Sequence, residues 1–183
     1  MATPPTFTAG SILTAAQMNA AGLWLVKTQT VGAGVTSVTV EGAFNADYDA
    51  YKITWTGGTL STSAPIGLQM RTSAGSVSNT NYYGGLSYTT YSGLPQGVAD
   101  SNASQFTFAG AGDNNTFGQI DLTLLNPFLT KYTIICSSVV SGTYGGQYNG
   151  VHSLANSYTS FVLDPFTTTT MTGGTIRVYG YRN

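Results

Sequence analysis

Beyond the first 27 residues, apolar and polar positions alternate along the chain with a period of two, as in half-buried β-strands. The alternation is clearest in residues 51–55, where Tyr51, Ile53 and Trp55 share one face. The same pattern closes the chain, where Ile176 and Val178 share a face. Clusters of Gly, Asn, Ser and Pro separate the apolar runs and predict turns. The pattern predicts an all-β fold of about eight to ten strands, in an antiparallel, jelly-roll-like β-sandwich.

Several glycine-rich segments carry weaker strand signals. We expect a turn at residues 56–59, a Ser/Gly/Asn loop at 72–81, and a strand pair or long loop from Tyr82 to Tyr91. Residues 141–150 are also rich in glycine, and His152 is expected to lie in a Gly/Asn-rich loop just after them.

The first 27 residues differ from the rest and predict a short helix. Thr14 fits the N-cap, Gln17 completes a capping box, and Leu13 and Met18 occupy the hydrophobic-staple positions. Such a helix is too short to be stable alone, so it needs a surface to bury against, either its own sandwich or another subunit. We therefore divide the chain into an attachment segment, residues 1–27, and a β-sandwich domain, residues 28–183.

Charge is scarce in this chain and restricts its partners. Six Lys and Arg face seven Asp and Glu, for a net charge of −1, and only 7% of residues are charged. Without a basic field the chain cannot hold a phosphate backbone, which argues against nucleic acid as a partner. Near-zero net charge gives little repulsion between copies and favours a homo-oligomer. No signal peptide and no apolar run long enough to cross a membrane is found, so membrane insertion is not expected.

The residue types needed for catalysis or metal binding are equally scarce. His152 is the one histidine, Glu41 the one glutamate, and no zinc, nucleophile-elbow or phosphate-loop motif is found. Asp47 and Asp49 could bind calcium, although a solvated turn is the favoured interpretation. Cys136, the one cysteine, is interpreted as a small buried hydrophobe in an apolar run. We expect no enzyme activity, no catalytic residues, no metal and no cofactor.

Tyrosines in the glycine-rich segments are the candidate ligand-binding residues. Tyrosine offers a large contact area at low entropic cost, together with a hydroxyl for hydrogen bonding. Such side chains suit a sugar or a protein surface, and the favoured alternative is that they pack subunits together or cover the ends of the sandwich. The candidates are Tyr82, Tyr83, Tyr88, Tyr91, Tyr144 and Tyr148.

Three segments together resemble small structural proteins of tailed-bacteriophage virions, of the minor tail, tail-fibre or surface-appendage type. They are the opening Phe-Thr-Ala-Gly-Ser-Ile-Leu-Thr-Ala-Ala-Gln-Met-Asn at 7–19, the segment 37–53 with Ser-Val-Thr-Val and Asp-Tyr-Asp-Ala-Tyr-Lys-Ile, and the ending Gly-Thr-Ile-Arg-Val-Tyr-Gly at 174–180. The resemblance implies a β-sandwich head behind a short attachment segment, commonly in trimers. It carries over no catalytic residues.

The expected function is therefore a compact tail or surface-appendage subunit of the virion, made in the host cytoplasm. Its expected partners are itself, other tail or capsid proteins and a host-surface glycan. Capsid decoration or head-fibre protein is one alternative, a free lectin-like carbohydrate-binding module is another, and an enzyme ranks third. The candidate docking residues are the apolar side chains at and around the predicted helix: Phe7, Ile12, Leu13, Met18, Leu23 and Trp24.

Overall fold

The computed structural model describes residues 10, 23–166 and 168–181, and these form an all-β antiparallel sheet with no helix. The predicted helix and most of the attachment segment lie outside the described residues. The described part holds twelve strands, more than predicted from the sequence: β1 Leu23–Thr30, β2 Val38–Val40, β3 Ala50–Leu60, β4 Ala64–Arg71, β5 Tyr82–Thr90, β6 Pro95–Ala103, β7 Phe106–Asp113, β8 Phe117–Leu125, β9 Lys131–Val140, β10 Tyr144–Asn156, β11 Ser160–Pro165 and β12 Met171–Tyr181.

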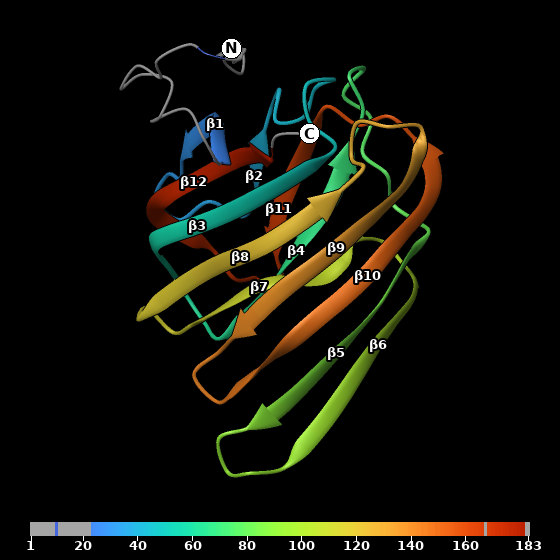
Figure 1. Ribbon diagram of the computed structural model, residues 1–183. Helices are drawn as coiled ribbons and strands as arrows, with labels where there is room; N and C mark the ends of the chain where they lie inside the picture. The colour runs from blue at the N-terminus through green and yellow to red at the C-terminus, as the bar shows by residue number, and fades with distance from the viewer. Residues whose placement is uncertain (1–9, 11–22, 167, 182–183) are drawn as a thin grey trace.

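Strand β8 is where the sheet forks. One edge of β8 pairs with β3, which continues to β12 and β1. The other edge is shared, because residues 117–120 pair with β7 whereas residues 122–125 pair with β9. Two arms leave from this edge: the β7 arm, in the order β7-β4-β11-β2, and the β9 arm, in the order β9-β10-β5-β6. Figure 1 shows β4 and β11 of the β7 arm behind β3 and β8.

The two arms face each other across a core rich in aromatic side chains. Tyr82 of β5 accepts a hydrogen bond of 2.8 Å from the Met70 amide of β4, and its ring lies edge-on to Phe106 of β7 at 4.9 Å. Ser137 of β9 donates a 2.8 Å hydrogen bond to the Ala109 carbonyl of β7. Tyr82 joins strands far apart in the pairing order, and Ser137 joins the two strands that share one edge of β8. The arms are therefore held together by side chains as well as by β8.

The predicted faces of the two clearest strands are confirmed. Tyr51, Ile53 and Trp55 of β3 are all fully buried, as are Ile176 and Val178 of β12. The two strands pair directly, with Ile53 opposite Val178 and Trp55 opposite Ile176. Cross-strand pairs of this kind are the unit from which a sheet gains stability.

The predictions for three glycine-rich segments are wrong. Residues 56–59, predicted as a turn, continue β3 through an irregularity between Trp55 and Gly58, where Gly57 takes a positive φ of 75°. Residues 82–90 form one strand, β5, with Tyr91 in the turn that follows, and residues 144–156 form β10, so His152 lies in a strand and not in a loop. Strand β1 spans residues 27 and 28, where the sequence analysis divides the chain, and it pairs with β12 from Leu23 onward. Long-range pairing holds these segments extended despite their weak strand propensity.

Candidate functional site

The docking candidates divide into a described and an undescribed group. Phe7, Ile12, Leu13 and Met18 lie outside the described residues. Leu23 opens β1 with 48% of its side chain exposed, whereas Trp24 is half-buried against the core. The indole Nε1 of Trp24 is buried with no hydrogen-bond partner among the described residues.

The six candidate tyrosines do not share one surface. Tyr82 and Tyr148 are fully buried, so their rings belong to the core and are not presented to a ligand. Tyr83 points to the opposite face of β5 from Tyr82 and is exposed. Tyr82 and Tyr83 differ in burial because successive side chains of a strand point to opposite faces of the sheet.

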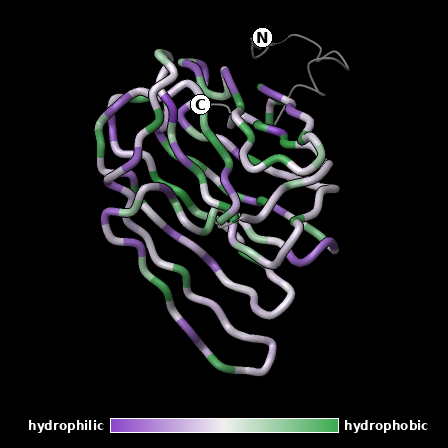
Figure 2. The backbone as a smooth tube through the Cα atoms, turned by 180° about the vertical axis from the view of Figure 1, so that it is seen from behind, coloured by the Kyte–Doolittle hydropathy of each residue, from purple (hydrophilic) through white to green (hydrophobic). Residues whose placement is uncertain are grey.

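Tyr88, Tyr91 and Tyr144 gather near the far end of the β5–β6 hairpin. The rings of Tyr88 and Tyr144 contact each other at 4.8 Å, and Tyr91 is 64% exposed at the turn. Figure 2 shows this hairpin reaching away from the body with hydrophilic and hydrophobic positions mixed along it.

An open groove of about 480 Å³ lies across the hairpin and the start of β10. Gly145 and Gly146 pair with Thr89 and Tyr88. Gly146 has no room for a side chain, because a Cβ there would lie 2.3 Å from the Ser87 carbonyl oxygen. Polar side chains and one aromatic ring, that of Tyr88, surround the groove. Its lining consists of Ser87, Tyr88, Thr89, Pro95, Gln96, Gly145, Gly146 and Gln147.

Asp100 of β6 holds the hairpin against the body of the fold. One carboxylate oxygen accepts from the Tyr148 hydroxyl at 2.6 Å and from the Thr107 amide at 3.2 Å, and the other accepts from the Thr107 hydroxyl at 2.7 Å. Burial raises the pKa of Tyr148, and the neighbouring Asp100 carboxylate raises it further. The Tyr148 hydroxyl therefore stays protonated and acts as the hydrogen-bond donor. The groove therefore lies on a hairpin anchored by a charge-assisted network.

The single histidine lies in a second buried polar cluster. The His152 ring stacks on Tyr82 at 4.1 Å, with Nδ1 lying 3.1 Å from the Asn81 carbonyl and Nε2 lying 2.8 Å from the Tyr158 hydroxyl. Because a carbonyl can only accept, Nδ1 must carry the proton and Nε2 accepts from Tyr158. Burial lowers the pKa of His152, against a smaller opposing effect of the Asn81 hydrogen bond. The cluster suits a neutral, structural histidine.

Acidification is expected to destabilise the fold through this histidine. In the unfolded chain His152 binds a proton near the ordinary pKa of 6.5. In the folded chain its pKa is lower, so His152 is protonated only at a lower pH. The free energy of unfolding should therefore fall as the pH drops below about 6.5, and this loss should level off below the folded pKa. Urea unfolding of wild type and His152→Gln between about pH 7.5 and 5 checks this, because the variant should lack this part of the slope. Equal slopes in both proteins would contradict it.

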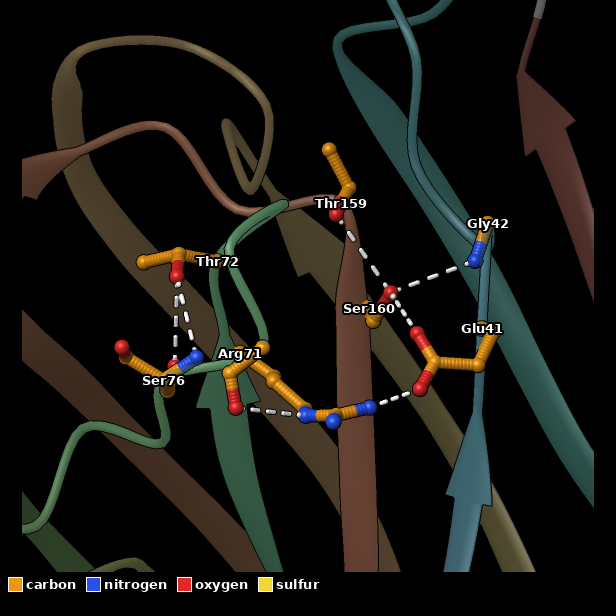
Figure 3. Close-up of polar contacts among 8 residues, drawn as sticks. Glu41, Gly42, Arg71, Thr72, Ser76, Thr159 and Ser160 are labelled. Carbon is orange, nitrogen blue, oxygen red and sulfur yellow. Dashed lines mark hydrogen bonds and ion pairs between the residues drawn. The ribbon is translucent and has the colours of Figure 1, made fainter.

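Glu41, Arg71 and Ser160 form a polar cluster beside β2, β4 and β11 (Figure 3). Glu41 follows β2 and pairs with Arg71 at the end of β4, while the Ser160 hydroxyl of β11 donates to the Glu41 carboxylate at 3.0 Å. The same hydroxyl accepts from the Gly42 amide at 3.2 Å. Ser160 is only 1% exposed, so its hydroxyl cannot reach a substrate. The cluster instead stabilises the packing of β2, β11 and β4 against one another.

The remaining ionisable side chains do not converge. Among the described residues no three His, Cys, Asp or Glu side chains lie together as a metal site would require. Asp47 and Asp49 are both exposed in the segment before β3. Nor does any helix in the described ranges have the length and apolar character needed to cross a membrane.

The interpretation of Cys136 as a buried side chain is wrong. Its thiol is exposed, because Thr133, Ile135 and Ser137 of β9 point inward and Ile134 and Cys136 point outward. The inward Ser137 is satisfied by the Ala109 carbonyl, which explains how a polar residue takes the core position.

Comparison with known proteins gives no family. No protein-family model matches the chain, and no curated protein matches it significantly. Among solved structures, the chain is similar at a TM-score of 0.11 and 13% identity to one chain of a structure titled "Structure of infectious bursal disease virus Gx strain". The match covers 86% of this chain and 41% of the viral one. A likeness this low carries no argument about fold or function.

Proposed function

We propose that the chain is a structural subunit of a tailed-bacteriophage virion, in a compact tail or surface appendage. The observation that carries the proposal is an antiparallel strand framework whose surface is built almost entirely from uncharged side chains. Such a surface suits lasting contact between protein subunits better than proton transfer or metal chemistry. The sequence resemblance to virion structural proteins points in the same direction.

In this proposal the two arms are the layers of a jelly-roll-like β-sandwich. The segment 1–27 docks the subunit through its apolar side chains, and copies associate around a symmetry axis as a homotrimer. The same features serve a capsid decoration or head-fibre protein, which is the alternative position in the particle.

Purified virions provide the test. Mass spectrometry should find the chain in the particles at a stoichiometry typical of a structural component, and cryo-electron microscopy should place it on the tail or on the capsid. Absence of the chain from purified particles would overturn the proposal.

A second candidate function is binding of a host-surface glycan in the groove of the β5–β6 hairpin. A glycan array with the full chain would test it. The double variant Gln96→Ala/Gln147→Ala should lose binding, whereas Gln29→Ala, on β1 and away from the groove, should keep it. A free lectin-like module would bind glycans and yet be absent from particles, which separates the two functions.

A further inference from the structure

The outward face of the sheet carries a continuous apolar row that crosses five strands. The row is Ala50 of β3, Leu125 of β8, Ile134 of β9, Val151 of β10 and Tyr83 of β5, and each residue is paired in the ladder with the next. Their neighbours in sequence, such as Tyr51, Leu124 and Ile135, point into the core. We call these five side chains the outer row. It crosses the sheet where β8 ends and β9 begins (Figure 1).

Further large apolar side chains lie beside the outer row. Beyond β3, Leu23 of β1 pairs with Tyr181 of β12, and two residues along β1 Leu25 pairs with Tyr179. Tyr132 lies two residues before Ile134 on the same face of β9, and is 54% exposed. Six of the ten large hydrophobic side chains exposed in the described part of the chain belong to this one region, so the patch is not a random scatter: Leu23, Leu25, Tyr83, Tyr132, Ile134 and Tyr181.

One ion pair lies beside the outer row. Lys52 of β3 and Asp121 of β8 form an ion pair on the rungs next to the row. The row itself contains no carboxylate, ammonium or guanidinium group. A strongly charged partner would meet no opposite charge on the outer row. A second copy of the chain would meet no like charge there, so the two rows would not repel each other.

We propose that the outer row is the surface through which copies of this chain associate. The proposal rests on the proposed function, because it assigns a surface to the homo-oligomer. Seven strands at about 4.8 Å make the face about 30 Å long, and three rungs make it about 20 Å wide, or about 600 Å². That size approaches the roughly 800 Å² per partner of a stable interface, with an apolar centre and the polar rungs as its rim.

Ile134→Arg tests the proposal, with Val140→Arg as the matched control. Both residues lie on the outward face of β9 with nearly equal exposure, 39% and 40%, but Val140 lies six residues along, away from the outer row. Sedimentation velocity of the full chain should show an oligomer for wild type and for Val140→Arg. The dissociation constant of Ile134→Arg should be about 30-fold higher or more, as for a central interface residue.

Cys136 supplies a second, independent readout. It is exposed, lies two residues from Ile134 on the same face, and is the one cysteine of the chain. Its reaction with a maleimide should be slow in the wild-type oligomer and fast on dilution or in Ile134→Arg. Circular dichroism should show that both arginine variants are folded. If Ile134→Arg is unfolded, Tyr132→Ala on the same face takes its place in both measurements.

Three results would overturn the proposal. A wild-type chain that stays monomeric at high concentration is the first, and an oligomer that neither variant weakens is the second. The third is a monomer whose Cys136 reacts slowly at every dilution, because then another part of the same chain covers the face. None of these results concerns the presence of the chain in virions, so failure of the proposed function is detected separately.

Discussion

Replacing Trp55 by alanine is expected to lower the free energy of unfolding by about 3–5 kcal/mol, the range for truncating a fully buried large aromatic side chain. Trp55 is fully buried in β3, and its indole Nε1 donates to the Gly173 carbonyl at 3.1 Å. A Cβ on Gly118 of β8 would lie only 2.5 Å from the Trp55 ring, so the ring lies directly on the neighbouring backbone. The variant loses this packing and leaves a cavity that the sheet can fill only partly.

Urea unfolding followed by far-ultraviolet circular dichroism measures the loss. Tyr91→Ala is the control, because Tyr91 is 64% exposed and its truncation should change stability by less than about 0.5 kcal/mol. A loss below about 1 kcal/mol in Trp55→Ala would contradict the close packing of the indole ring on β8.

Strand faces with a strict alternation could be predicted from the sequence alone. Tyr51, Ile53 and Trp55 are the clear case, because large apolar residues separated by polar ones leave one choice of inward face. In the run from Thr133 to Ser137 the alternation does not show which face points inward. Two adjacent isoleucines make both faces apolar, and the structure turns the polar residues inward, where Ser137 meets the Ala109 carbonyl.

The glycine-rich strands could not be predicted because their stability comes from partners distant in the sequence. Gly84 of β5 has no side chain, and a Cβ there would occupy the place of the Tyr148 hydroxyl. Only when β5, β10 and β6 are side by side does that hydroxyl reach Asp100. From the local sequence alone these glycines indicate turns. In the folded chain they allow neighbouring strands and side chains to approach closely.

The candidate site was predictable only in part for the same reason. Tyrosine enrichment drew attention to the β5–β6 and β10 region, where Tyr88 lines the groove. It could not separate Tyr88 from Tyr82 and Tyr148, whose burial is decided by the opposite arm and by Asp100. The apolar row on the outer face was equally hidden, because its five members come from five segments and meet only through the register of the ladders.

Replacing Asp100 by alanine is expected to lower the free energy of unfolding by about 2–4 kcal/mol. The carboxylate accepts three hydrogen bonds, and without it the buried Tyr148 hydroxyl and the Thr107 amide and hydroxyl lose their acceptor. Asp121→Ala is the matched control, because Asp121 makes a surface ion pair with Lys52 and its loss should cost about 1 kcal/mol or less. Chemical denaturation of the two variants checks the difference, and equal losses would contradict the role given to Asp100.

The same change should alter the hairpin locally, and not only the global stability. Among the described strands β6 pairs with β5 alone, so its other edge is free to add a foreign strand. Asp100 protects this edge by pointing a charge inward, toward Thr107 and Tyr148, and thereby holds β6 against the body. We expect faster amide hydrogen exchange across residues 95–103 and more concentration-dependent aggregation in Asp100→Ala than in Asp121→Ala. If exchange in β6 were unchanged, the hairpin would be held by its pairing with β5 alone, and the groove would not depend on this network.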